Sequence, residues 1–154
     1  MSGWTNQKKR FSLPKVYLGA IFCFLSFFIL ETPSFATQYA IVVHPENTIQ
    51  LDTNELLQIF KKEYKYWKDG SNVVVYLPSE AKVNDALFSS LGTTHQKLSE
   101  HFSRLREQGS RVLPPFYEKT RHIRKVVKRN RAAIGVVEAS ESQEFRVLFT
   151  FNGE

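Results

Sequence analysis

The sequence contains almost no cysteine. Among its 154 residues there is one, Cys23, which lies in an apolar run near the N-terminus. Phe22 precedes it at the position where a lipoprotein signal needs a small residue, so we do not interpret Cys23 as a lipid-attachment site. The rest of the chain therefore contains no disulfide, no thiolate metal site and no thiol nucleophile.

Motifs of catalysis and metal binding are also lacking. The four histidines are scattered along the chain (His44, His95, His101 and His122). His95 and His101 are six residues apart, which does not fit the four-residue spacing of a helical metal pair. There is no Ser-His-Asp order, paired-carboxylate motif or nucleotide-binding loop. We therefore expect a protein that is not an enzyme and needs no cofactor.

The N-terminus has the pattern of a signal peptide. Basic residues stand before an apolar run that covers residues 16–30 (Lys8, Lys9, Arg10 and Lys15). Ser34-Phe35-Ala36 then places small residues at the two positions that a signal peptidase reads. The run is short for a membrane span, which needs about 20 residues. We expect a signal peptide over 1–36, cleavage after Ala36 and a periplasmic location, with an uncleaved inner-membrane anchor as the alternative.

The expected mature chain, residues 37–154, has the size of one domain. The whole chain carries 21 basic and 15 acidic residues. Without the leader's four basic residues and one acidic residue, 17 basic and 14 acidic residues remain, a net charge of about +3. Such a mild charge gives no reason to expect nucleic acid as a partner.

Apolar residues recur along the mature chain with the periods of strands and helices in turn. Their patterns predict four strands, at 39–43, 73–77, 133–137 and 144–151. Helical spacing and capping signals predict four helices, which begin after Asp52, Ser79 and Thr93 and at Glu118. Strands separated by helices indicate an α/β fold, a single three-layer sandwich with a mostly parallel sheet.

The segments near the C-terminus are predicted in more detail. Residues 111–116, which include Pro114-Pro115, are expected to be an extended connector. In the last strand the alternation places four apolar side chains on one face (Phe145, Val147, Phe149 and Phe151). This half-exposed pattern indicates a strand at the edge of the sheet.

Four stretches follow one another in a recognisable order: IVVHPENTIQLD, LLQIFKKEYKYWKDG, VVVYLPSEAKVNDALF and AAIGVVE. Together they span roughly residues 40–138. The second stretch has Ile59, Phe60, Trp67 and Gly70 at the spacing of an Ile-Phe-x-Gly-x-x-x-x-Trp-x-x-Gly signature. The ordered set resembles the phosphate-type periplasmic solute-binding proteins of ABC importers, in the PBP-like superfamily.

The resemblance implies one lobe of a type II periplasmic binding protein, because the matched stretches belong to that family's second lobe. It also implies an oxyanion site where the family has a Ser-Gly-Thr loop, here Ser79, Glu80, Ala81 and Lys82. Backbone N–H groups, the helix dipole and a hydroxyl hold the anion at such a site. Glu80 and Ala81 replace the family's Gly and Thr, and the family's preceding Arg is absent. Ser79 is therefore expected to be a plain N-cap or, in the alternative, part of a weak phosphate site.

Trp67 and Gly70 are expected to form a corner between the first helix and the strand at 73–77. Gly70 permits the turn, and Trp67 would cover the end of the core. The alternative is that Trp67 contacts a ligand or a partner.

A basic run follows Glu118 and contains no acidic residue (Lys119, Arg121, Arg124, Lys125, Lys128, Arg129 and Arg131). On a helix these cations would lie on the outer face. They form either a solvated surface or a contact for an anionic membrane, an ABC importer or another protein.

Two functions remain open at this point. The first is a periplasmic lobe that binds phosphate or a similar small anion, weakly, in connection with an ABC importer. The second is a scaffold without a transport role, which binds another protein through the basic helix and the Trp67 corner.

Overall fold

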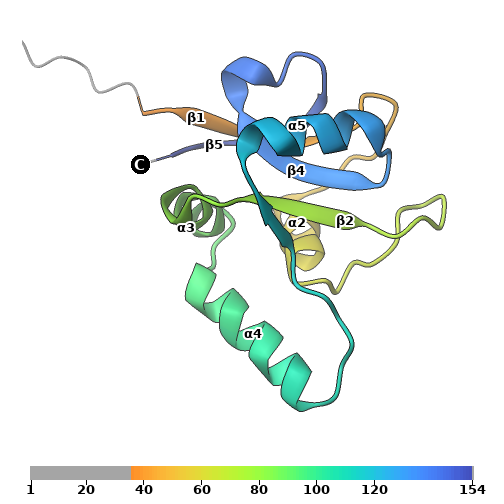
Figure 1. Cartoon of the computed structure of the whole chain (residues 1–154), viewed down its shortest axis with the longest axis vertical. Coiled ribbons are helices and arrows are strands. Elements are labelled where there is room, and N and C mark those ends of the chain that lie inside the picture. Colours follow the sequence, from red (N-terminus) through yellow and green to blue (C-terminus); the bar gives the residue numbers. More distant parts are fainter. Residues whose placement is uncertain (1–35, 154) are drawn as a thin grey trace, which may run out of the picture. The chain divides into compact units, whose positions relative to one another are not determined.

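The computed structural model describes residues 36–153 (Figure 1). They form five strands: β1 Gln38–Val43, β2 Val74–Pro78, β3 Phe116–Glu118, β4 Ala133–Glu138 and β5 Arg146–Asn152. They also form four α-helices: α2 Thr53–Phe60, α3 Ala81–Ser90, α4 His95–Glu107 and α5 Thr120–Arg129. A short 3-10 turn, η1 Ala139–Glu141, follows β4. The expected signal peptide lies outside the described residues, apart from Ala36, and its cleavage stays a prediction.

The strands form one mixed sheet in the order β3-β2-β4-β1-β5. β2 is parallel to β3 and β4, whereas β1 is antiparallel to β4 and β5. β1 therefore runs against the other four strands. The α/β class is confirmed, but the expected mostly parallel sheet is not, because two of the four strand pairings are antiparallel. Both antiparallel pairings involve β1, which lies between β4 and β5.

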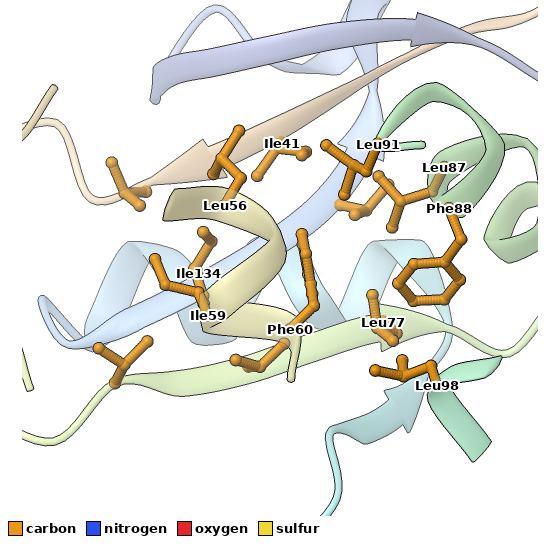
Figure 2. Packing of buried hydrophobic residues seen from close by; sticks show 14 of the residues in the cluster. Ile41, Leu56, Ile59, Phe60, Leu77, Leu87, Phe88, Leu91, Leu98 and Ile134 are labelled. Atoms are coloured by element: carbon orange, nitrogen blue, oxygen red, sulfur yellow. The ribbon is translucent and has the colours of Figure 1, made fainter. Parts of the chain in front are cut away.

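Helices cover both faces of this sheet. α2, α3 and α4 pack on one face, and α5 packs on the other (Figure 1). Successive side chains of a strand point to opposite faces, so Ile41 joins the core under α2 and Ala40 joins the core under α5. Figure 2 shows the larger core, where Phe60 and Phe88 meet edge to face with ring centroids 5.9 Å apart. Burial of each ring stabilises the fold by roughly 1.5–3 kcal/mol.

Two helices begin with side-chain caps, one at the predicted residue and one at the residue next to it. Asp52 and Glu55 form the predicted capping box of α2, with both hydrogen bonds at 2.8 Å. α4 is capped by Thr94, whose Oγ1 accepts from the N–H of Lys97, and not by Thr93 as predicted. The cap moves by one residue because the N–H of Thr93 donates to the carbonyl of Phe88 and so belongs to the end of α3.

Three helices end with the same backbone motif, in which a residue with positive φ closes the last turn. After α3 and α4 this residue is glycine, with φ of 73° at both Gly92 and Gly109. After α2 it is Lys62, with φ of 61°. The N–H groups of Lys62 and Glu63 donate to the last turn of α2 in the pattern that the two glycine sites also show. Lys62 thus takes a conformation that an L side chain rarely adopts.

The Trp67 corner has the predicted structural role. Trp67 is 5% exposed, and its Nε1 donates to the carbonyl oxygen of Ala132 at 2.9 Å. Gly70 has φ of 82°, and its N–H donates to the carbonyl of Trp67. The Trp67 side chain therefore links the turn before β2 to Ala132, the residue that precedes β4, through this hydrogen bond.

The C-terminal segments differ from expectation in two ways. Residues 116–118, expected as connector and helix start, form the edge strand β3. β5 is an edge strand as predicted, but its apolar residues do not share one face, because the pairing with β1 skips Leu148. This bulge puts Phe145 in the core under α5 and Phe151 in the core on the other face.

Gly135 in β4 sets the distance between α5 and the sheet. A Cβ on Gly135 would lie 2.3 Å from Cγ2 of Ile123 and 3.1 Å from Cγ2 of Val127. The bare backbone at this position therefore lets α5 pack closely.

Candidate functional site: the carboxyl edge of the sheet

The carboxyl ends of β2 and β3 lie side by side, and a helix follows each of them. The connection after β2 enters α3 on one face, and the connection after β3 enters α5 on the other face (Figure 1). The N–H of Ser79 donates to the carbonyl of Glu118 at 3.0 Å, so the two connections are joined at their start. In open α/β sheets, ligands bind outside the carboxyl ends of the strands where connections leave over opposite faces.

The N-termini of these two helices lack side-chain caps. α3 has Glu80 at the N-cap and α5 has Lys119 there, and neither side chain makes a capping hydrogen bond. In contrast, α2 and α4 are capped by Asp52 and Thr94. The first backbone N–H groups of a helix have no acceptor within the helix, and without a side-chain cap they are available to solvent or to an anion.

The four predicted site residues, Ser79, Glu80, Ala81 and Lys82, are together and exposed at the start of α3. The expectation that Ser79 is the N-cap is wrong. Its N–H extends the β2–β3 ladder, which keeps Ser79 in the extended chain and leaves Glu80 as the last residue before the helix. The hydroxyl of Ser79 is therefore not used as a cap.

Carboxylates reduce the positive potential at this edge. Glu80 lies at the start of α3, and Glu118 ends β3 beside it. Burial raises the pKa of Tyr39, and the nearby carboxylates of Glu138 and Glu80 raise it further. The edge thus carries negative charge on the side of β1, which weakens the binding of an anion there.

Asn84 is a buried polar residue at the start of α3 that the sequence analysis did not single out. Its side chain is 1% exposed, and its Nδ2 donates to the carbonyl of Pro78 at 2.8 Å. Its Oδ1 has no hydrogen-bond partner among residues 36–153. An unpaired buried acceptor costs about 1–3 kcal/mol. The signal in the sequence was a polar residue between the apolar positions Val83 and Leu87.

Two of the cations of α5 form ion pairs with the connection between β4 and β5. Arg124 donates to Glu141 at 2.9 Å and to Glu144 at 3.0 Å, and Lys128 donates to Glu144 at 2.5 Å. Hydrogen bonds from Lys128 and then from Arg124 hold the pKa of Glu144 below its usual value. These two cations therefore bind the β4–β5 connection, and nothing supports the predicted contact with a partner through them.

The remaining predicted cations of α5 form no ion pair within residues 36–153 (Lys119, Arg121, Lys125 and Arg129). Arg121, Lys125 and Arg129 are four residues apart and exposed, so they share one side of the helix. Lys119, Arg121 and Lys125 line a hollow of about 380 Å³ at the start of α5. The positive surface is thus smaller than predicted and lies next to the carboxyl edge.

Neither a membrane-spanning helix nor a metal-binding cluster is found in the part of the chain that the structure describes. Within residues 36–153 no helix is long and apolar enough to cross a membrane. In that range no group of three or more His, Cys, Asp or Glu side chains is placed to hold a metal ion.

Solved structures with this fold are known. One is a protein from Clostridium perfringens assigned as a phosphate ABC transporter substrate-binding protein, with bound phosphate (16% identity, TM-score 0.58). Another is an ABC-type phosphate transport receptor from Vibrio cholerae (19% identity, TM-score 0.47). No family model matches the sequence, and no curated protein matches it.

The similarity to the structure from C. perfringens shows the fold alone, and the one from V. cholerae is too distant to support an argument. The matches cover 73% of this chain in both cases, and 45% and 46% of the two other chains. The chain therefore spans less than half the length of the solute-binding proteins that it resembles. The expected likeness to a lobe of such a protein is supported by the structure from C. perfringens.

Proposed function

We propose that residues 37–154 form a lobe of the phosphate-receptor type, which binds phosphate or a similar small oxyanion weakly at the carboxyl edge. The observation that carries this proposal is that β2 and β3, joined at their carboxyl ends by the Ser79–Glu118 hydrogen bond, each lead into a helix whose N-terminus has no side-chain cap. Each N-terminus offers backbone N–H groups and roughly half a positive charge from the helix dipole. An oxyanion is the ligand that matches both.

The side chains around these N–H groups have opposing effects on the affinity for an anion. The hydroxyl of Ser79 and the amine of Lys82 favour an anion next to Ala81. The carboxylate of Glu80 opposes it, by about 0.3–1 kcal/mol for an exposed charge at a helix start. A single lobe also leaves the anion partly in water, which screens every contact. We therefore infer weak affinity.

The proposed setting is the periplasm, in connection with an ABC importer of phosphate. The fold shared with the phosphate-bound protein from C. perfringens supports this setting, as does the signal-peptide pattern that ends at Ala36. In this setting the chain acts as a binding protein and not as an enzyme.

Calorimetric titration with inorganic phosphate at low salt tests the proposal. Glu80→Gln removes the opposing charge and keeps the shape, so it should tighten binding by about twofold to fivefold. Glu107→Gln removes an exposed carboxylate at the far end of α4 and should leave the affinity unchanged. A titration without heat for both the wild type and Glu80→Gln would refute anion binding.

The second candidate is a scaffold that binds another protein at the same edge. It is favoured by the exposed aromatic residues of the edge strand, Phe116 at 48% and Tyr117 at 44%, next to the unpaired cations of α5. For a folded protein, absence of phosphate heat in every variant would leave this candidate as the better explanation.

A further inference from the structure

A second hollow lies at the opposite end of the sheet, and one of the residues that line it is Lys62, which has an unusual backbone conformation. The equivalent positions after α3 and α4 are Gly92 and Gly109, which take a positive φ without strain. Lys62 takes the same conformation with a side chain, which is strained. Strained backbone conformations of this kind cluster at functional sites, which suggests that the side chain of Lys62 has a function.

The amine of Lys62 stands on the wall of this hollow. Its side chain is half-buried, and Nζ donates to the carbonyl of Val73 at 3.5 Å. Burial lowers the pKa of Lys62. The hollow measures about 440 Å³ and lies between the Trp67 corner and residues 110–113. Val73 and Leu113 come just before β2 and β3, so the hollow is at the amino ends of these strands, away from the proposed anion site.

The lining combines positive charge with exposed apolar surface. The two most exposed large hydrophobic side chains of residues 36–153 are Leu113 at 69% and Tyr66 at 58%, and both border this hollow. Its cations are Lys62, Lys65 and Arg111, and no acidic residue lines it. Among the described residues, none of the three cations takes part in an ion pair.

This lining distinguishes between classes of ligand. A free phosphate would match the cations but would leave Leu113 and Tyr66 without a partner. A purely apolar segment would bury cations that have no counter-charge, which is costly. We propose that the hollow docks a short acidic peptide segment of a partner protein, with an apolar side chain seated between Leu113 and Tyr66. Three cations without acids supply the charge complementarity, and the apolar pair supplies the anchor.

The test uses isotope-labelled protein purified as the cell processes it, and a blocked peptide, Glu-Asp-Leu-Asp-Glu. NMR titration should shift the amide signals of residues 62–73 and 110–113. Arg111→Glu and Leu113→Ser should each weaken the binding of this peptide by about fivefold to tenfold. Matched controls are Lys97→Glu, an exposed cation on α4, and Val147→Ser, an exposed apolar residue on β5. Both controls should bind as the wild type does.

Three results would overturn the proposal. The first is no shift in these two segments at millimolar peptide. The second is equal binding of a peptide in which Ser replaces the Leu, since the apolar anchor would then have no role. The third is a shift at residues 62–73 that depends on protein concentration without peptide, which would assign the hollow to contact between two copies of the chain. Phosphate binding at the carboxyl edge is measured separately and does not affect this outcome.

Discussion

Gly135→Ala is the change that most directly tests how α5 lies on the sheet. The added Cβ would be 2.3 Å from Cγ2 of Ile123, whereas carbon atoms prefer separations of about 3.5–4.0 Å. Ile123 and Val127 are fully buried, so neither side chain can move into solvent. α5 must therefore shift outward by about 1 Å. Overpacking of this kind costs about 1–3 kcal/mol.

A compensating change makes the reasoning sharper. Ile123→Leu removes the branched methyl that the new Cβ would meet, while it nearly conserves the volume, and by itself it should cost less than about 1.5 kcal/mol. In the double variant we expect about 1 kcal/mol of the Gly135→Ala loss to return, because the two residues are in contact. Urea unfolding of the wild type, both single variants and the double variant gives the four free energies of unfolding.

The opposite result has a clear meaning. Without a clash, Gly→Ala in extended backbone stabilises a protein by about 0.4–1 kcal/mol, since the unfolded chain loses freedom. If Gly135→Ala were neutral or stabilising, or if Ile123→Leu gave no recovery, α5 would not pack on β4 as described. The connections that lead into α3 and α5 would then not lie together at the carboxyl edge, as the proposed anion site requires.

Other predictions concern single features of the fold and of the leader. Trp67→Ala should lower the free energy of unfolding by about 3–5 kcal/mol, whereas Trp67→Phe, which loses mainly the hydrogen bond to Ala132, should lower it by about 0.5–1.5 kcal/mol; a Trp67→Ala variant as stable as the wild type would contradict the buried position of the ring. Lys62→Gly should raise the free energy of unfolding by about 0.5–1 kcal/mol in urea, because it relieves the positive φ, and a loss of stability would show that side-chain packing outweighs the strain. Mass spectrometry of a periplasmic extract should find Thr37 as the first residue, and recovery of the full-length chain in membranes would show that the leader is kept as an anchor.

Local patterns in the sequence predicted local structure well. The capping box at Asp52 and Glu55 involves atoms only three residues apart, so the sequence alone is enough to specify it. The turn at Gly70 follows in the same way from the residues nearby, whereas the corner with Trp67 was expected from the family resemblance, since the ring is held by Ala132, far along the chain. The short strand β3 was missed because only three residues pair, directly after Pro114-Pro115, and no periodic pattern develops over so short a length.

Features that depend on distant residues were not predictable from the sequence. The direction of β1 is set by its pairing with β4 and β5, and an apolar run such as 39–43 has the same pattern in either direction. The bulge at Leu148 reverses the facing of β5, although the alternation along 144–151 is regular.

The candidate site shows the same limit. Ser79 looks like an N-cap from its neighbours, but its N–H is taken by Glu118, a residue far along the chain. The helix was predicted correctly at the basic run. Arg124 and Lys128, however, form ion pairs with Glu141 and Glu144, and only the fold brings these residues together. The number of cations in the sequence is therefore larger than the number that remain outside ion pairs within residues 36–153.

β1 lies between β4 and β5, the two strands nearest the C-terminus, and this position has a consequence for how the protein folds. Gln38 pairs with Asn152, and the N–H of Gly153 donates to the carbonyl of Thr37. Among the described residues, β1 is made first and has no partner until β4 has been made, and contacts between such distant residues slow folding. If the leader acts as expected, the late pairing of β1 delays completion of the sheet until nearly the whole chain has been made, which favours export before folding is complete.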